Sequence, residues 1–243
     1  MRVFYAGDSP ADGPARYLLG ILKHLKAEVT HLPPGNQLTP DLLRSDFDLY
    51  IFSDFSYRDF LKPSEQILIK KVAQGAGFLM VGGWGSFAGP FGGWHNSAIE
   101  SLLPVTCLNR DDRQNFPGGA LVLPATSHKI LKGISFAKPA AICGVNQVRL
   151  KSHAQVLLNA KAINYRNGNV FLNSAVTPLL AVGGTFHPRI AAFMTDFAPH
   201  WSAGFIDWGT RVKRIKIQEK IEIQVGNLYV QFISQLLSWL AKP

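Results

Sequence analysis

The stretch that decides the fold is GFLMVGGWGS, residues 77–86, in which an apolar run passes directly into a glycine-rich turn. A strand that is apolar on both faces is typical of a parallel sheet covered by helices on both sides. Two earlier segments, residues 2–8 and 47–54, show the same order of an apolar run followed at once by polar residues. We therefore predict three parallel strands whose carboxyl ends lie at one edge of a sheet.

Helical patterns alternate with these strands. Apolar residues at spacings of three and four predict a helix over residues 17–25 and a second helix that follows Ser64 as its N-cap and ends at Gly75. A short strand is expected at residues 28–32, after the first helix. This alternation predicts an α/β protein with a doubly wound, mostly parallel sheet.

The later half of the chain departs from this pattern. Prolines and glycines break up residues 111–166, which predicts an edge-strand or small-lobe insertion with antiparallel strands. Residues 178–184 and 189–194 are expected to form two strands joined by a turn, and the alternating apolar residues of 215–225 indicate extended chain. A final helix is predicted at residues 227–240.

Composition excludes several classes of protein. Hydrophobic residues make up 47% of the chain and charged residues 17%, which does not fit a disordered chain. No apolar run reaches the roughly 18–20 residues of a membrane span, and the first residues read as a strand rather than as a signal peptide. We therefore expect a cytoplasmic protein with no membrane partner. Both cysteines, Cys107 and Cys143, are expected to be small buried side chains rather than reactive thiolates.

The net charge of +9 raises the question of an acidic partner. A basic surface attracts nucleic acids and acidic proteins, yet the charges are interspersed except in the cluster Arg211–Lys216. Nucleic-acid modules show a basic stripe with interleaved aromatic residues, and the sequence has no such stripe. We predict no nucleic-acid partner. A basic interaction module that uses residues 211–216 stays open as an alternative, as does a homo-oligomer.

Polar residues follow the predicted strands directly. Ligands of a parallel α/β sheet bind at the carboxyl ends of its strands, so these segments are expected to form one rim. The candidate ligand-binding residues are Asp8, Asp54, Gly82, Gly83, Trp84, Gly85 and Trp201. The glycine-rich turn matches no phosphate-binding or dinucleotide-binding pattern, and the histidines lack metal-ligand spacing. We predict no metal and no cofactor, and close backbone packing is the structural alternative for the turn.

Ser86, Asp196 and His200 are the candidate catalytic residues. They would form a serine-hydrolase triad in which His200 is the base and Asp196 orients it, or they would use a bound water instead of the serine. Each also has a structural interpretation: Ser86 and Asp196 cap local turns, and His200 packs on Trp201.

The segments assembled above resemble the class I glutamine amidotransferase-like superfamily. Within it they resemble an uncharacterised bacterial branch of glutamine amidotransferase-domain proteins related to the trehalose-utilisation group. The matching segments are Phe52–Asp54, Gly82–Gly89 with the following Trp94, Leu102–Val105 and Asp196–Trp201. The resemblance covers nearly the whole chain and implies a single flavodoxin-like domain over residues 1–243.

The resemblance also implies where a glutaminase would carry its nucleophile. Active members of the superfamily place a cysteine in a G-x-C-x-G turn and complete the triad with His-x-Glu. Here Trp84, Gly85 and Ser86 occupy that turn, and Ser202 stands two residues after His200. Without a thiolate to attack the carboxamide, we predict no glutaminase activity by this mechanism. The leading hypothesis is a protein that binds a small polar metabolite or a protein partner at the rim, with a hydrolase as the alternative.

Overall fold

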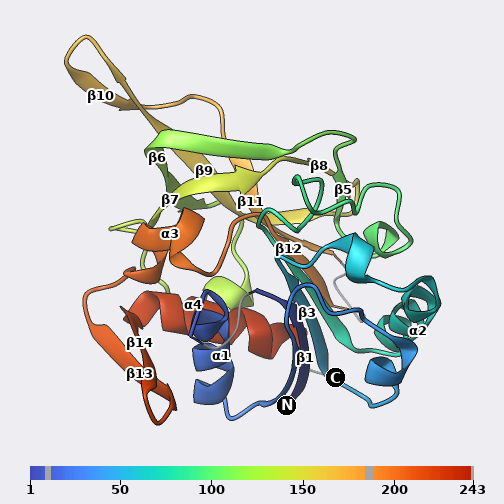
Figure 1. The fold of residues 1–243 in the computed structure, drawn as a ribbon. Coiled ribbons are helices and arrows are strands. Elements are labelled where there is room, and N and C mark those ends of the chain that lie inside the picture. The colour runs from blue at the N-terminus through green and yellow to red at the C-terminus, as the bar shows by residue number, and fades with distance from the viewer. Residues whose placement is uncertain (9–11, 184–188, 242–243) are drawn as a thin grey trace.

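The computed structural model describes residues 1–8, 12–183 and 189–241 (Figure 1). Its centre is a ten-stranded sheet in the order β2-β1-β3-β4-β12-β11-β9-β6-β7, with β10 paired to β9. The parallel part consists of β1 (Arg2–Gly7), β2 (Glu28–Leu32), β3 (Leu49–Ser53), β4 (Gly77–Val81) and β12 (Ile190–Phe193). The antiparallel part consists of β11 (Thr177–Gly183), β9 (Gln155–Arg166), β6 (Arg113–Pro124), β7 (Ala141–Asn146) and β10 (Asn169–Leu172).

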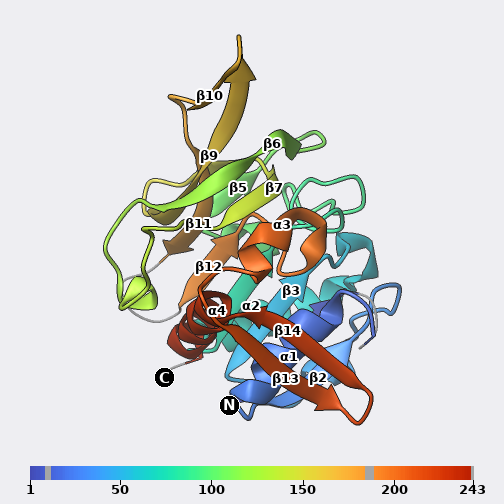
Figure 2. The same ribbon diagram turned by 90° about the vertical axis from the view of Figure 1, so that its left-hand side faces the viewer.

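Helices cover both faces of the parallel part. On one side lie α1 (Ala15–His24), α4 (Asn227–Leu240) and the hairpin of β13 (Val212–Gln218) and β14 (Ile221–Gly226), and on the other side lies α2 (Lys62–Ala73) (Figures 1 and 2). The remaining elements are α3 (Pro199–Ile206), the strand pair β5 (Val105–Cys107) and β8 (Val148–Leu150), and the short 3-10 helices η1 (Pro40–Leu43), η2 (Tyr57–Asp59), η3 (Ile99–Ser101) and η4 (Lys129–Leu131).

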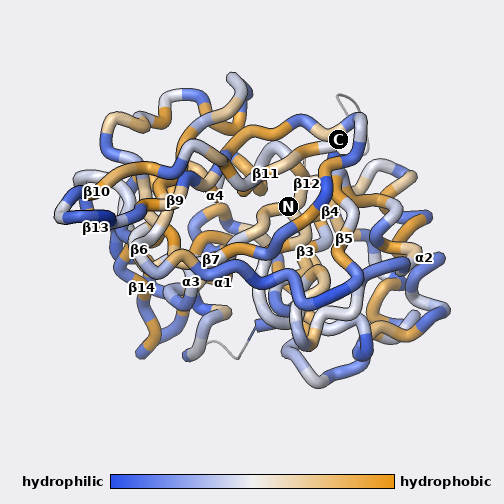
Figure 3. Tube along the Cα trace, turned by 90° about the horizontal axis from the view of Figure 1, so that it is seen from above, coloured by the Kyte–Doolittle hydropathy of each residue, from blue (hydrophilic) through white to orange (hydrophobic). Residues whose placement is uncertain are grey.

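Apolar side chains on both faces of the central strands form the core. Every residue of β3, β4 and β12 is buried, and these strands run as apolar stretches through the interior in Figure 3. The Phe52 ring lies 5.2 Å from that of Phe78 and 5.6 Å from that of Trp94, between ring centroids. Burial of one such side chain contributes about 1.5–3 kcal/mol to stability, so the strand that carries the glycine-rich turn is held rigidly in place.

The predicted fold class is confirmed: the sheet is mostly parallel in the first half, and antiparallel strands from the middle segment and β11 extend it. The C-terminal strands β13 and β14 form a separate antiparallel pair. Residues 111–166 supply β6 to β9, and residues 178–183 and 190–193 lie in two antiparallel strands. The turn expected between those two strands falls on residues 184–188, which lie outside the described residues. Assignment of the whole chain to one domain stays a prediction.

Two local predictions are wrong. Ser64 is not the N-cap of α2, because the helix begins at Lys62 and the Ser64 hydroxyl donates to the Leu38 carbonyl (2.8 Å), a tertiary contact that local propensity does not encode. Cys143 is exposed rather than buried, because its side chain points to the solvent side of β7. Within the described part of the chain, no helix is long and apolar enough to cross a membrane.

Candidate functional site

A cavity of about 530 Å³ opens at the carboxyl ends of β1, β3 and β4. Five of the residues predicted for the rim line it: Asp8, Asp54, Trp84, Gly85 and His200. The other lining residues are not among those predicted from the sequence: Pro14, Pro34, Ser56, Arg58, Asp59 and Phe91. The alternation of strands and helices thus brings together segments that lie far apart in the sequence.

Asp8 and Asp54 occupy equivalent positions on neighbouring strands. In the register of β1 with β3, Gly7 pairs with Ser53, and each aspartate is the next residue. Both have a left-handed backbone, with φ of 51° and 53°, a conformation that costs energy for residues other than glycine and recurs at ligand sites. The Tyr5 hydroxyl donates to Asp8 Oδ2, and the Gly85 N–H donates to Asp54 Oδ1. Both carboxyl groups are therefore held in place beside the cavity.

Burial shifts the acidity of these carboxyl groups. Desolvation raises the pKa of Asp8 to about 7, and the charge of Asp54 adds to the rise, while the hydrogen bond from Tyr5 opposes it. Desolvation also raises the pKa of Asp54, opposed by the Gly85 N–H and by His200. The pKa of Asp196 is raised by burial and by the charges of Asp8 and Asp54. The three carboxyl groups are thus close enough to interact, and Asp8 is able to gain or lose a proton near neutral pH.

The glycine-rich turn is shaped by its contact with Asp54. Gly83 has φ of +155°, and a Cβ atom there would lie 2.5 Å from Asp54 Oδ1. A Cβ atom on Gly85 would lie 2.8 Å from the Asp54 carbonyl oxygen. Ser86 is buried, and its Oγ accepts from the Asp54 N–H at 3.0 Å. The turn therefore needs glycine so that its backbone can reach Asp54. Close backbone packing and a position beside the cavity, the two interpretations of this stretch, thus occur together.

The three candidate catalytic residues are not hydrogen-bonded to one another within the described chain. The Ser86 hydroxyl accepts from the Asp54 N–H at 3.0 Å, and Asp196 Oδ1 accepts from the Ala198 N–H at 2.8 Å. The exposed His200 lies over the cavity, with its ring centroid 6.2 Å from that of Trp84 rather than against Trp201. In this arrangement the three residues do not form a hydrogen-bonded triad. The serine triad therefore stays a prediction.

Trp84 forms an exposed aromatic wall of the cavity. Its side chain is 42% exposed, and the Arg113 guanidinium lies 4.3 Å from its ring centroid. Arg113 is in turn held by an ion pair with Asp111 at 2.6 Å. Trp201, by contrast, is buried against Gly144 of β7 and does not line the cavity. The cation–π contact with Arg113 favours this orientation of the Trp84 ring.

Sequence reasoning missed the polar groups that support the turn. Asn146 donates to the Gly83 carbonyl (3.1 Å) and accepts from the Gly83 N–H (2.9 Å), and Asp112 accepts from Asn146 (2.7 Å) and from the Ala88 N–H (2.7 Å). Both side chains are fully buried, and desolvation raises the pKa of Asp112 to about 6. Neither residue belongs to a local sequence motif. Their contact with the turn becomes visible only when the antiparallel part of the sheet is placed beside it.

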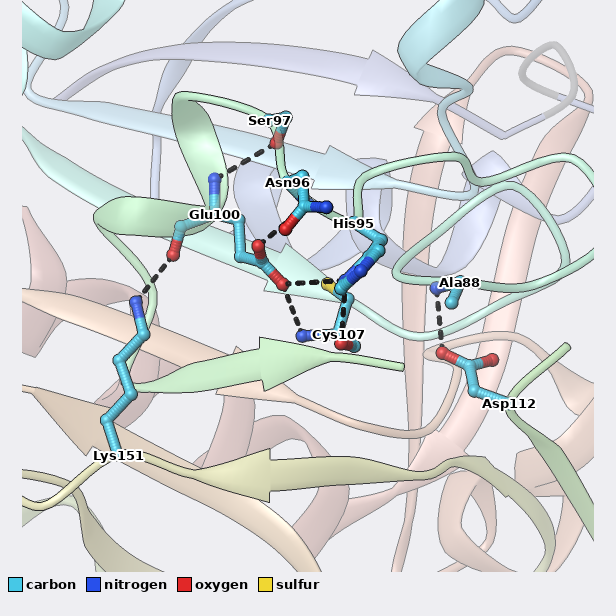
Figure 4. Close-up of polar contacts among 8 residues, drawn as sticks. All are labelled: Ala88, His95, Asn96, Ser97, Glu100, Cys107, Asp112 and Lys151. Carbon is cyan, nitrogen blue, oxygen red and sulfur yellow. Dashed lines mark hydrogen bonds and ion pairs between the residues drawn. The ribbon is translucent and has the colours of Figure 1, made fainter. Parts of the chain in front are cut away.

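A second group of reactive residue types lies away from the cavity, around Glu100 (Figure 4). Glu100 accepts from the backbone N–H groups of Asn96 (2.9 Å) and Cys107 (2.5 Å), and Lys151 donates to the Glu100 carbonyl oxygen (2.7 Å). His95 Nδ1 lies 3.8 Å from Glu100 Oε1. Burial raises the pKa of the Cys107 thiol, which keeps it protonated. We call these five residues the Glu100 cluster.

No set of three or more His, Cys, Asp or Glu side chains is arranged to hold a metal ion among residues 1–8, 12–183 and 189–241. The carboxyl groups of Asp8 and Asp54 beside the cavity accept hydrogen bonds from the Tyr5 hydroxyl and from the Gly85 N–H.

The flavodoxin-like sheet and the site at the carboxyl ends of its strands define a class I glutamine amidotransferase-like protein. The chain belongs to the family described as "Putative glutamine amidotransferase", whose model matches residues 45–217. Neither cysteine lies in the turn after β4, since Cys107 is in β5 and Cys143 in β7.

Solved structures share this fold over the whole chain. The chain is similar to the cytoplasmic protein STM1381 of Salmonella typhimurium LT2, with a TM-score of 0.73, 24% identity and 100% coverage of both chains. It is also similar to the cytoplasmic protein STM3548 of Salmonella typhimurium, with a TM-score of 0.74, 21% identity and 100% coverage of both chains. A ThuA-like protein of Parabacteroides merdae has a TM-score of 0.59 at 11% identity, with coverage of 100% of this chain and 90% of that chain. No curated protein sequence matches the chain.

Proposed function

We propose that this protein binds a small polar metabolite in the cavity at the carboxyl ends of β1, β3 and β4, in the cytoplasm, and that it lacks cysteine-based glutaminase activity. The observation that carries the proposal is that this cavity, of about 530 Å³, is lined by carboxyl groups and by an exposed aromatic ring. Pockets of about 300–1,000 Å³ with a few convergent polar groups are typical of small-molecule sites.

The lining favours a ligand that donates hydrogen bonds. Asp8, Asp54 and Asp59 present carboxyl oxygens to the cavity, and these are acceptors when ionised. Trp84 and Phe91 add exposed aromatic surface, on which a flat apolar face or a cation stacks. A compound with hydroxyl or amino groups on one side and an apolar face on the other matches this lining.

A hydrolase that uses a bound water is the second candidate. It is favoured by Asp8, which lines the cavity and whose pKa is raised to about 7, close to the optimum of a general base at neutral pH. In this version Asp8 takes a proton from the attacking water, and His200 lies across the same cavity. Ser86 is less suited to attack, because it is buried and its oxygen already accepts a hydrogen bond.

A ligand screen by thermal unfolding tests the proposal. Amino acids including glutamine, sugars, amino sugars, nucleotides and divalent metals would each be added to the pure protein. A ligand present at one hundred times its dissociation constant adds about 2.7 kcal/mol of stability, which shifts the melting temperature clearly. We expect a hit whose shift is lost in Asp54→Asn.

The matched control is Asp41→Asn, which removes an exposed carboxyl group that does not line the cavity. The hit should persist in this variant. A hit that survives Asp54→Asn would contradict the proposed site. Consumption of the hit by the wild-type protein but not by Asp8→Asn would favour the hydrolase over simple binding.

A further inference from the structure

The hairpin formed by the end of β9 and by β10 projects from the body of the molecule (Figures 1 and 2). The register of β9 with β11 ends at Ala160 and that with β6 ends at Ala162. Beyond these points Ile163–Arg166 pair with β10. We call residues 163–172 the arm. Ile163 lies beside Gly118 and Gly119 of β6 at the base of the arm, whereas Tyr165 and Val170 beyond it are exposed. A two-stranded hairpin by itself is marginally stable in water, so a partner surface would stabilise the exposed part of the arm.

One face of the arm is apolar. Residues directly opposite in an antiparallel pair share a face, and so do residues two positions apart. Tyr165 pairs with Val170, and Ile163 pairs with Leu172, so all four side chains lie on the same face. Tyr165 is 73% exposed and Val170 is 71% exposed. The opposite face carries the pairs Asn164–Phe171 and Arg166–Asn169.

The charge distribution indicates what covers this face. Arg166 is the single charged residue between Ala162 and Val176, in a chain with a net charge of +9. An anionic membrane or an acidic protein would be recognised through basic residues beside the apolar face, and the arm does not supply a cluster of them. An uncharged apolar face is complementary to another uncharged apolar face, and a two-fold contact supplies that match because both sides are identical.

The position of the arm also favours a second copy of the chain. The basic hairpin β13–β14 carries Lys213, Arg214 and Lys216 and lies at the opposite end of the molecule in Figures 1 and 2. Two molecules of charge +9 repel each other where their basic surfaces meet, and this repulsion is screened beyond about 8 Å at physiological ionic strength. Contact through the arms keeps the two basic hairpins apart.

We propose that two copies of this protein form a dimer by packing the apolar faces of their arms against each other. In this dimer the exposed rings of Tyr165 and the side chains of Val170 from both copies lie at the centre of the contact. The inference concerns a surface outside the cavity, so it does not depend on the proposed metabolite site.

Sedimentation velocity over a range of protein concentrations tests this proposal. We expect the wild-type protein to sediment as a dimer at micromolar concentration, and the variant Tyr165→Lys/Val170→Lys to sediment as a monomer because it places four charges in the contact. The matched control Asn164→Lys/Asn169→Lys adds the same charge to the opposite face of the same arm and should leave the dimer intact.

Circular dichroism and the melting temperature would show that both variants are folded. A wild-type protein that is monomeric at all concentrations would overturn the proposal. So would a dimer that survives the Tyr165→Lys/Val170→Lys substitution, or one that the control pair dissociates equally. Binding of the monomer to neutral or anionic lipid vesicles through Tyr165 and Val170 would assign the face to a membrane instead.

Discussion

The cavity and the Glu100 cluster contain similar residue types but use them differently. The Glu100 cluster holds a carboxylate, a histidine, a thiol and a lysine, yet the carboxylate oxygens accept from backbone N–H groups and the lysine donates to backbone carbonyls (Figure 4). At the cavity, Asp8 and Asp54 also accept hydrogen bonds, from the Tyr5 hydroxyl and the Gly85 N–H, but both residues have a left-handed backbone and border open space. A group of reactive side chains becomes a candidate site only where it faces a space that a ligand can enter.

The energetic roles of the two regions differ accordingly. The bonds of Glu100 join the segment around η3 to β5, so they contribute to stability. The buried carboxyl groups beside the cavity have raised pKa values, which means that their ionised forms destabilise the folded state. Residues that reduce stability are expected at functional sites, where evolution exchanges stability for activity.

The largest expected effect is on stability, in Glu100→Ala. This substitution leaves the N–H groups of Asn96 and Cys107 without their acceptor. Cys107 is buried, and a buried unsatisfied donor costs about 1–3 kcal/mol, whereas Asn96 is exposed and its N–H group costs less. We expect a loss of about 3 kcal/mol in the free energy of unfolding, measured with urea, and no change in ligand affinity of the folded protein. Glu100→Gln, which keeps one acceptor oxygen, should lose less. Equal stability of Glu100→Ala and the wild type would show that the cluster is not a structural support.

Asp8→Asn is expected to act in the opposite way. It removes a desolvated charge while its amide oxygen still accepts from Tyr5, so the free energy of unfolding at pH 8 should rise by about 1 kcal/mol or more. Affinity for the cavity ligand should fall about tenfold, because a charged acceptor is worth about 1.5–3 kcal/mol. Isothermal titration and urea unfolding measure the two effects. If Asp8→Asn loses stability and keeps its affinity, Asp8 has a structural role like that of Glu100 and not a ligand-binding role.

The pH dependence of stability tests whether the Asp8 carboxyl group beside the cavity reduces stability when it is ionised. The pKa of Asp8 is raised from 3.8 to about 7 in the folded protein, so folding favours its protonated form. Its contribution to stability is fully present below about pH 3.8 and is lost as the pH rises to about 7. We expect the wild-type free energy of unfolding to fall relative to that of Asp8→Asn between pH 4 and pH 7. Parallel curves for the two proteins would contradict a raised pKa at Asp8.

The smallest expected effect on stability is that of Trp84→Ala. The ring is 42% exposed, so its removal should change the free energy of unfolding by less than about 1 kcal/mol. Affinity should still fall several-fold, since an aromatic contact contributes about 0.5–1.5 kcal/mol. Val212→Ala, which truncates an exposed side chain in β13, is the control and should leave affinity unchanged. An unaffected affinity in Trp84→Ala would remove the aromatic wall from the proposed site.

Periodicity in the sequence determined the architecture and part of the rim. The strand at residues 77–81 and the helix at residues 227–240 match the structure in their bounds, because continuous apolar runs and a repeating apolar stripe are local properties. The rule that ligands bind at strand carboxyl ends was enough to select Asp8, Asp54 and Trp84. The family resemblance, carried by short segments in a given order, is likewise readable from the sequence.

Only the tertiary structure decided which polar side chains face the cavity and which form hydrogen bonds that support the fold. Ser86 and Asp196 follow predicted strands just as Asp54 does, yet Asp54 lines the cavity and these two residues do not. Asp112, which directly precedes β6, and Asn146, the last residue of β7, support the turn from segments that are distant in sequence, and Cys143 is exposed by the direction of its side chain in β7. Hydrogen-bond partners, burial and shifted pKa values arise from groups brought together by folding, so the spacing of residues along the chain does not contain them.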